Sequence, residues 1–171
     1  HLMKPTLIDR VVSYDGLVVT STPTQTIGQP VSAATARTMR GILRQVVTDP
    51  HGTGKNAQAT GYTTAGKTGT AQKVDPGIKG YAKDKYIASF VGFTPVDDPH
   101  LVIYVLIDEP TQKLHTGALA HTGGTWAAPV FARITERALK YLNVAPDLPD
   151  AKPVKPHVAA AEPHAAPASK M

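Results

Sequence analysis

The sequence contains no cysteine, and this absence excludes several kinds of site. Disulfide frameworks, cysteine-ligated zinc sites and thiol nucleophiles all need that residue. Long apolar runs are also missing: the longest, Leu101–Ile107, is far shorter than the roughly 18 residues of a membrane-spanning helix. Charged residues make up 18% and hydrophobic residues 42% of the 171 positions, which excludes a coiled coil and a fully disordered chain.

The length predicts one domain with a net charge of +5, a mild excess that suits anionic partners without requiring nucleic acid. The first residues, His1-Leu2-Met3, show neither the basic nor the apolar region of a signal peptide. We therefore expect the sequence to begin at the cut edge of a longer protein or at a cloning scar.

The first part of the chain predicts a hairpin followed by a helix. Strands are expected over Leu7–Val12 and Leu17–Thr20 around an Asp15-Gly16 turn, with a loop from Ser21 to Val31. A helix over Ala33–Val47 would be capped by Ser32. Its apolar residues recur at helical spacing and predict a buried stripe made of Ala36, Met39, Leu43, Val46 and Val47.

The second part predicts two paired strands and a final helix. Tyr86–Phe93 and Leu101–Ile107 flank a proline-rich turn, and the second run is apolar throughout, as in a strand buried on both faces. The helix should begin between Thr125 and Pro129 and end near Leu142. We expect it to bury one face and to carry a Glu136–Lys140 pair outside; the predicted face comprises Trp126, Val130, Ile134, Ala138, Tyr141 and Leu142.

The composition changes near residue 144. From Val144 to Met171 alanine and proline dominate and no aromatic residue occurs, so this segment has too little apolar surface to fold. The sequence thus predicts a domain over residues 4–143 and a disordered tail over residues 144–171.

One segment, Gly61–Thr68, matches the phosphate-loop pattern G-x-x-x-x-G-K-[ST]. That pattern binds phosphate where a buried strand enters the loop and a helix leaves it. Here the preceding residues are polar, and Gly69, Pro76, Gly77 and Gly80 follow before any helix. A nucleotide site is therefore the weakest of the hypotheses.

The same residues have a second interpretation as a strand. In an extended chain Lys67 and Gly69 face one side, and Thr68 and Thr70 face the other. A glycine in a strand lets another backbone approach closely. Such an edge can pair with an extended peptide while the ammonium and hydroxyl groups hold a carboxylate, an arrangement that suits acyl transfer on a peptide.

This stretch resembles the third active-site motif, K-T-G, of penicillin-binding proteins and serine β-lactamases. Three flanking blocks resemble the class B penicillin-binding proteins, the monofunctional transpeptidases of cell division and elongation, and the set covers nearly everything from Lys4 to Pro146. The blocks are His51-Gly52-Thr53-Gly54-Lys55, Tyr86–Pro95 and Gly123–Phe131.

The resemblance implies an α/β fold (α+β in stricter usage), a five-stranded antiparallel sheet between helices with Ala65–Lys73 at the active-site edge. The family draws two of these five strands from the missing N-terminal portion, so three are expected in this chain. The resemblance also implies that Lys67 supports the catalytic network and that Thr68 and Thr70 bind the terminal carboxylate of a stem peptide or a β-lactam. The backbone N–H of Thr70 would serve the oxyanion hole, and Gly69 would leave room for substrate. No metal or organic cofactor is implied.

The family also uses a nucleophilic serine in S-x-x-K and a second motif, S-x-N. None of the serines fits either pattern; they are Ser13, Ser21, Ser32, Ser89 and Ser169. We therefore expect the chain to be the C-terminal half of a D,D-transpeptidase domain, inactive alone and dependent on the missing N-terminal half. The resemblance places the parent on the periplasmic side of the inner membrane with division or elongation proteins.

Two features leave other functions open. The lysines between residues 55 and 85 could bind a polyanion, but few aromatic residues lie among them and no nucleic-acid module is evident. A non-catalytic module that binds peptide termini or polyanions is therefore the main alternative. Before Gly123, relatives often carry two tyrosines where this chain has His121-Thr122, which could shift substrate or drug preference. The histidines show no metal-ligand spacing.

Overall fold

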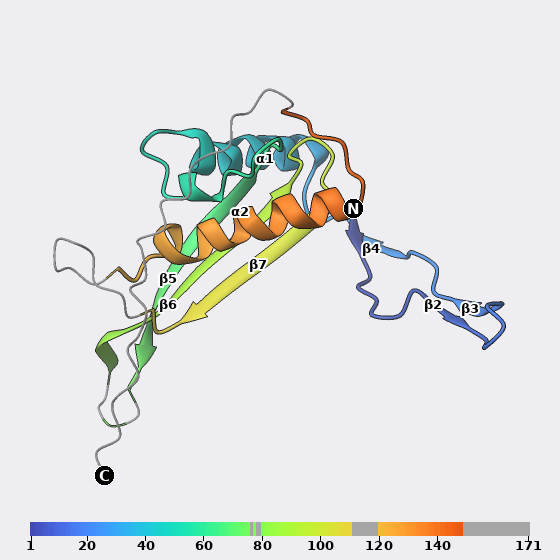
Figure 1. The fold of residues 1–171 in the computed structure, drawn as a ribbon, viewed down its shortest axis with the longest axis horizontal. Coiled ribbons are helices and arrows are strands. Elements are labelled where there is room, and N and C mark those ends of the chain that lie inside the picture. The colour runs from blue at the N-terminus through green and yellow to red at the C-terminus, as the bar shows by residue number, and fades with distance from the viewer. Residues whose placement is uncertain (76, 78–79, 111–119, 149–171) are drawn as a thin grey trace, which may run out of the picture. The chain divides into compact units, whose positions relative to one another are not determined.

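The computed structural model describes residues 1–75, 77, 80–110 and 120–148 (Figure 1). It divides into two compact units, His1–Met39 and Arg40–Met171, and the division falls within helix α1 (Ala33–Thr48). Within the described ranges, no helix has the length and apolar character needed to cross a membrane.

The first unit contains two small antiparallel pairs. Strand β1 (Leu2–Met3) pairs with β4 (Thr26–Gly28), and β2 (Arg10–Val12) pairs with β3 (Val18–Ser21). Gly16 supplies the positive φ of 84° that the hairpin turn needs. The predicted hairpin is confirmed, although its first strand begins at Arg10. The loop predicted over residues 21–31 is wrong in part, because the backbone of β4 finds a partner in β1.

Helix α1 begins where its cap predicts. The Thr35 amide donates to Ser32 Oγ at 3.1 Å, which confirms the N-cap. Val47 is buried in the core of the second unit, but Ala36 and Met39 are exposed, so the predicted stripe is wrong toward its N-terminal end. Helical periodicity identifies the apolar side of a helix but not whether a partner covers it.

The second unit is built on a three-stranded antiparallel sheet in the order β5-β6-β7. The strands are β5 (Ala65–Val74), β6 (Tyr81–Thr94) and β7 (Leu101–Asp108), and the register aligns Thr68 with Phe90 and Phe90 with Val105. The predicted strands are therefore confirmed, with β6 beginning at Tyr81 rather than Tyr86. Among the described residues, β5 and β7 form the two edges of the sheet.

Helix α2 (Gly123–Tyr141) crosses one face of this sheet (Figure 1). Its fully buried residues include Ala127, Ala128 and Phe131, whereas Ile134 and Tyr141 are exposed. The predicted buried face is therefore wrong in most of its residues, although Val130 packs against the core. The other face of α2 packs on the sheet because glycines of the sheet have no side chain there and leave room for its bulky residues. A Cβ on Gly92, for example, would lie 2.9 Å from Phe131 Cζ.

Two further expectations for this helix also need correction. It begins at Gly123, earlier than predicted, since both glycines pack closely against neighbouring backbone. Glu136 does not form the predicted surface pair: its Oε1 accepts a hydrogen bond from the Thr60 amide at 2.7 Å. Because the Glu136 carboxylate accepts from a backbone amide of the loop before β5, it attaches this loop to α2.

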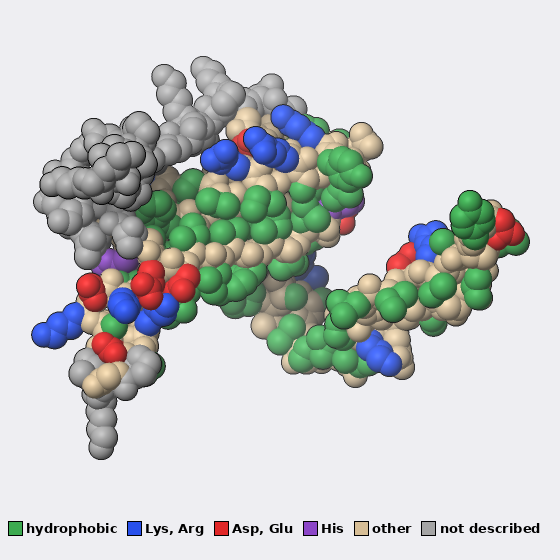
Figure 2. Space-filling view, turned by 60° about the horizontal axis from the view of Figure 1, so that its bottom comes forward, with side chains coloured by type: hydrophobic (Ala, Val, Ile, Leu, Met, Phe, Trp, Pro, Cys, Tyr) green, Lys and Arg blue, Asp and Glu red, His purple; other side chains and the backbone are tan. Residues whose placement is uncertain are grey.

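The opposite face of the sheet is open in the described residues. Val102, Tyr104 and Leu106 of β7 are 75%, 61% and 48% exposed, while Ile103, Val105 and Ile107 pack toward α2. The prediction that this strand is buried on both faces is therefore wrong, because within the described ranges a helix covers one face and leaves the other exposed. Figure 2 shows hydrophobic side chains gathered in rows on this unit, with Lys and Arg side chains along one border.

The end of α2 continues into a segment that packs on the domain. Asn143 has a φ of 55°, and the Val144 and Asn143 amides donate to Leu139 and Lys140 carbonyls at 3.0 and 3.1 Å. This is the Schellman pattern, with Val144 against Leu139 in a small core cluster. The predicted tail thus begins too early: residues 144–148 belong to the packed structure, and residues 149–171 lie outside the described residues.

Candidate functional site

The predicted motif lies on the exposed edge of the sheet. Lys67, Thr68, Gly69 and Thr70 are consecutive residues of β5 and pair with β6, with Gly69 opposite Ser89. Since Thr68 ends the phosphate-loop pattern inside a strand, no helix N-terminus follows to receive a phosphate. The phosphate-loop hypothesis is therefore wrong, and the extended strand is confirmed.

Three stretches of backbone meet beside this strand through a pair of glycines. An added Cβ on Gly123 would lie 2.0 Å from the Ser89 carbonyl oxygen and 2.7 Å from that of Gly69. On Gly124 it would lie 2.2 Å from the carbonyl oxygen of Thr53. Real Cβ atoms do not come so close to backbone, so only glycine lets α2 start against both β5 and the loop after α1. We call this contact the glycine junction (Gly123-Gly124).

A short helix next to the junction holds the loop in place. The 3₁₀ helix η1 (Lys55–Ala57) buries Ala57 in the core and directs Asn56 Nδ2 to the Gly124 carbonyl oxygen at 2.9 Å. The Gly54 amide donates to the Val46 carbonyl at 3.0 Å. The loop is thus anchored on both sides of Thr53 by hydrogen bonds and by core packing.

Lys67, Thr68 and Thr53 form a connected polar cluster. Lys67 Nζ donates to the Thr68 carbonyl oxygen at 2.9 Å and to Thr68 Oγ1 at 3.2 Å. Thr68 Oγ1 lies 3.0 Å from Thr53 Oγ1. Lys67 and Thr53 are exposed and Thr68 is half-buried, so the cluster is open to a ligand. An ammonium group and two hydroxyls in contact are suited to hold an anion.

Thr70 extends the same side of the strand. Its exposed hydroxyl accepts a hydrogen bond from the Gly123 amide at 3.3 Å, so its own proton is free for another acceptor. Gly69 faces the opposite side, where an added Cβ would lie 2.5 Å from Ser89 Oγ. The alternation predicted for these four residues is therefore present, with both threonines on the side of α2.

An ion cluster ties the two edge strands together beyond the motif. Lys73 Nζ on β5 lies 2.6 Å from Glu109 Oε1 and 2.9 Å from Asp108 Oδ1, both at the end of β7. The hydrogen bonds with Glu109 and then Asp108 raise the pKa of Lys73. Figure 2 shows positive and negative side chains mixed at one end of the unit. We interpret this cluster as structural support for β5.

Aromatic contacts position the residues before α2. The rings of Tyr86 and His121 stack with centroids 4.1 Å apart, and Trp126 Nε1 donates to the Ala120 carbonyl at 2.8 Å. His121 therefore lies over Tyr86, the β6 residue that pairs with Gln72 of β5, one strand inward from the motif strand. The predicted shift in substrate preference at this position remains a prediction.

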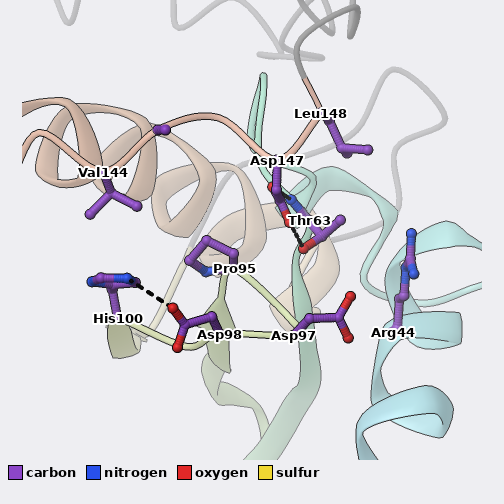
Figure 3. Close-up of a pocket in the computed structure, with 10 residues that line it drawn as sticks. Arg44, Thr63, Pro95, Asp97, Asp98, His100, Val144, Asp147 and Leu148 are labelled. Atoms are coloured by element: carbon purple, nitrogen blue, oxygen red, sulfur yellow. Dashed lines mark hydrogen bonds and ion pairs between the residues drawn. The ribbon is translucent and has the colours of Figure 1, made fainter.

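A separate pocket of about 470 Å³ lies where β5 and β7 begin and β6 ends (Figure 3). Asp147 accepts hydrogen bonds from the amide, at 2.7 Å, and the hydroxyl of Thr63 on one side. His100 lies 3.5 Å from Asp98 on the other. Within the described ranges, no group of three or more His, Cys, Asp or Glu could hold a metal ion. The residues that line this pocket do not include Thr53, Lys67, Thr68 or Thr70.

Sequence reasoning found the strand but missed the residues that support it. Thr53 and the glycine junction were noted only within flanking blocks, and Asn56 lies outside those blocks. Nothing in the spacing of these residues shows that the loop after α1 meets the start of α2. The paired glycines before a helical run were the available signal, since consecutive glycines at a helix start indicate close backbone approach.

Comparison with known proteins places this geometry in context. A sequence model described as the penicillin binding protein transpeptidase domain matches residues 1–136. Stage V sporulation protein D of Bacillus subtilis is 43% identical over 118 residues, which is 69% of this chain and 17% of the relative. Penicillin-binding protein PbpB of Mycolicibacterium smegmatis is 39% identical over 154 residues, 87% of this chain and 23% of the relative. The chain thus spans under a quarter of these relatives.

Solved structures agree. The transpeptidase domain of Burkholderia pseudomallei penicillin-binding protein 3 matches with a TM-score of 0.64 and 39% identity, covering 78% of this chain and 38% of that one. Penicillin-binding protein 3 from Mycobacterium tuberculosis, solved in complex with ampicillin, gives a TM-score of 0.64 and 38% identity, covering 88% of this chain and 32% of that one. The fold class and the family resemblance are therefore confirmed.

Proposed function

The chain belongs to the penicillin-binding protein transpeptidase family, and we propose that it is the C-terminal part of a peptidoglycan D,D-transpeptidase that β-lactams acylate. The observation that supports this function best is the exposed edge of β5, where Lys67, Thr68 and Thr70 stand beside the glycine junction. An extended edge with cationic and hydroxyl groups suits a peptide that ends in a carboxylate.

On this proposal, the hydroxyls of Thr68 and Thr70 donate to the terminal carboxylate of a stem peptide or a β-lactam. Lys67 Nζ, which donates to Thr68 Oγ1 at 3.2 Å, supplies the positive charge. Gly69 keeps the strand narrow where the substrate backbone passes. The Thr70 backbone N–H would donate to the oxyanion that forms as the substrate carbonyl is attacked, and losing one such donor costs on the order of 3 kcal/mol.

The nucleophile in this proposal comes from outside the chain. No serine of the sequence has the S-x-x-K or S-x-N pattern, so a serine borne by the rest of the domain would form the acyl intermediate. We propose that the chain alone is inactive and needs that N-terminal part. By family, we also propose that the whole protein acts on the periplasmic side of the inner membrane with division or elongation proteins, without a metal or organic cofactor.

A fluorescent penicillin tests this function on the chain combined with the S-x-x-K-bearing part of its domain. Covalent labelling should appear only in the combination. It should fall by about two orders of magnitude or more in Lys67→Ala, because the cation beside the carboxylate is lost. Labelling is measured by fluorescence after denaturing electrophoresis, which retains only covalent adducts.

The matched control is Lys85→Ala, which removes another exposed lysine from the neighbouring strand β6. This variant should label like the unmodified protein. Equal labelling of Lys67→Ala would refute the role given to that lysine. If no combination labels but the chain binds polyanions in a salt-sensitive manner, the non-catalytic alternative replaces this function.

A further inference from the structure

We propose that Thr53, which lies outside the K-T-G strand, is a positioning residue that orders the Thr68 hydroxyl for the incoming carboxylate. This inference rests on the proposed function and deepens it. It follows from the 3.0 Å contact between the two hydroxyl oxygens and from the way the loop around Thr53 is held.

The position of Thr53 is fixed by its main chain. A Cβ added to Gly124 would lie only 2.2 Å from the Thr53 carbonyl oxygen, so the loop and the start of α2 are in direct contact. On the other side of Thr53, the amide of the buried Gly54 donates to the Val46 carbonyl at 3.0 Å. Although exposed, Thr53 is therefore carried by a backbone that cannot shift without disturbing the core.

Counting hydrogen bonds gives Thr53 its role. A threonine hydroxyl has one proton to donate and two lone pairs that accept. Lys67 Nζ donates to Thr68 Oγ1 at 3.2 Å and occupies one lone pair. When Thr53 donates into the other, the Thr68 proton has no acceptor among the described residues and points outward.

A bound carboxylate selects this arrangement. Without a ligand, the proton between the two threonines can point in either direction, since either oxygen can be the donor. A carboxylate accepts the Thr68 proton and leaves Thr53 as the donor to Thr68. The hydrogen-bond network then runs from two donors, Thr53 and Lys67, through the Thr68 hydroxyl to the anion. Each hydrogen bond in it polarises the next. Ligands without the carboxylate gain nothing from it.

The test compares two probes on the 171-residue chain by ligand-observed NMR at low protein concentration. The probes are N-acetyl-D-alanyl-D-alanine and its C-terminal amide, which differ only in the carboxylate. Thr53→Val should bind the carboxylate probe about tenfold more weakly, the size of one hydrogen bond that serves a charged group. Binding of the amide should not change, and Thr53→Ser should restore carboxylate binding to within about twofold.

Thr48→Val is the matched control, because Thr48 is also exposed and its hydroxyl donates to the Arg44 carbonyl of α1. It should bind both probes like the unmodified chain. If Thr53→Val keeps its preference for the carboxylate, or weakens both probes equally, the inference is overturned while the proposed function stands. If the unmodified chain shows no preference for the carboxylate, the inference is overturned, and penicillin labelling of the combined domain decides the proposed function separately.

Discussion

Thr135 shows how much one buried hydroxyl contributes to this fold. It lies on the buried side of α2, is fully buried, and its Oγ1 makes no hydrogen bond with any residue that the structure describes. A buried polar group without a partner costs about 1–3 kcal/mol. Thr135→Val keeps the shape and removes that group, so we expect the free energy of unfolding to rise by about 1 kcal/mol in urea denaturation followed by circular dichroism.

Thr63→Val is the opposite case and serves as the control. Thr63 is also buried, but its Oγ1 accepts from the Val96 amide at 2.8 Å and donates to Asp147. Removing this hydroxyl leaves the buried Val96 amide without its acceptor and takes from Asp147 one of its two hydrogen bonds with Thr63, so the variant should lose about 1–3 kcal/mol. Shifts of the same sign in both variants would contradict the interpretation.

The residues of the motif could be predicted, whereas their supports could not. Lys67, Thr68, Gly69 and Thr70 are consecutive, and the period of a strand alone sets which of them share a side. Thr53 joins them only because the chain folds back over its own sequence. A contact between residues far apart in the sequence leaves no local pattern in a single sequence, so it became visible only in the structure.

At the scale of elements, the ion cluster of Lys73 makes the sheet sensitive to alkaline pH. Because Glu109 and Asp108 raise the pKa of Lys73 in the folded state, the cluster stabilises the fold fully below the ordinary lysine value of 10.5. That contribution is lost as pH rises through the raised folded value. We therefore expect Lys73→Met to lower stability at pH 7–9, and this deficit to shrink above pH 10.5.

The measurement is the difference in urea midpoint between the unmodified chain and Lys73→Met across that pH range. Lys85→Met, at an exposed position on β6, should show a smaller difference at every pH. Salt should reduce the effect of Lys73→Met, since half-exposed ion pairs are screened. A deficit that grows with pH would have the wrong sign for this cluster.

Element positions followed from the sequence more closely than element faces did. The bounds Ala65–Lys73, which the resemblance implied, agree almost to the residue with β5, which spans Ala65–Val74. For α2 the sequence offers two apolar stripes, and the bulkier one, with Val130 and Ile134, was predicted to be buried. The sheet instead takes the stripe of Ala127 and Phe131, because its own glycines set the shape of the surface.

At the scale of the whole second unit, residues 144–148 help to fix the start of the motif strand β5. Tyr62 donates from its hydroxyl to the Val144 carbonyl at 2.9 Å, and the Leu148 amide donates to the Gly61 carbonyl at 2.9 Å. Both contacts lie directly before β5. The composition predicted a disordered tail from residue 144 because few apolar side chains follow. Composition does not show the backbone hydrogen bonds that such a segment can still make.

The open face of the sheet leads to the last prediction. Val102, Tyr104 and Leu106 are exposed on β7, an edge strand in the described part of the chain, and an apolar edge promotes association. We expect the isolated chain to self-associate with increasing concentration in light scattering after size exclusion, and Leu106→Lys to shift it toward monomer. Tyr141→Lys, on the exposed side of α2, should have little effect. A monodisperse monomer that unfolds cooperatively would contradict this prediction, because the face would then need no partner.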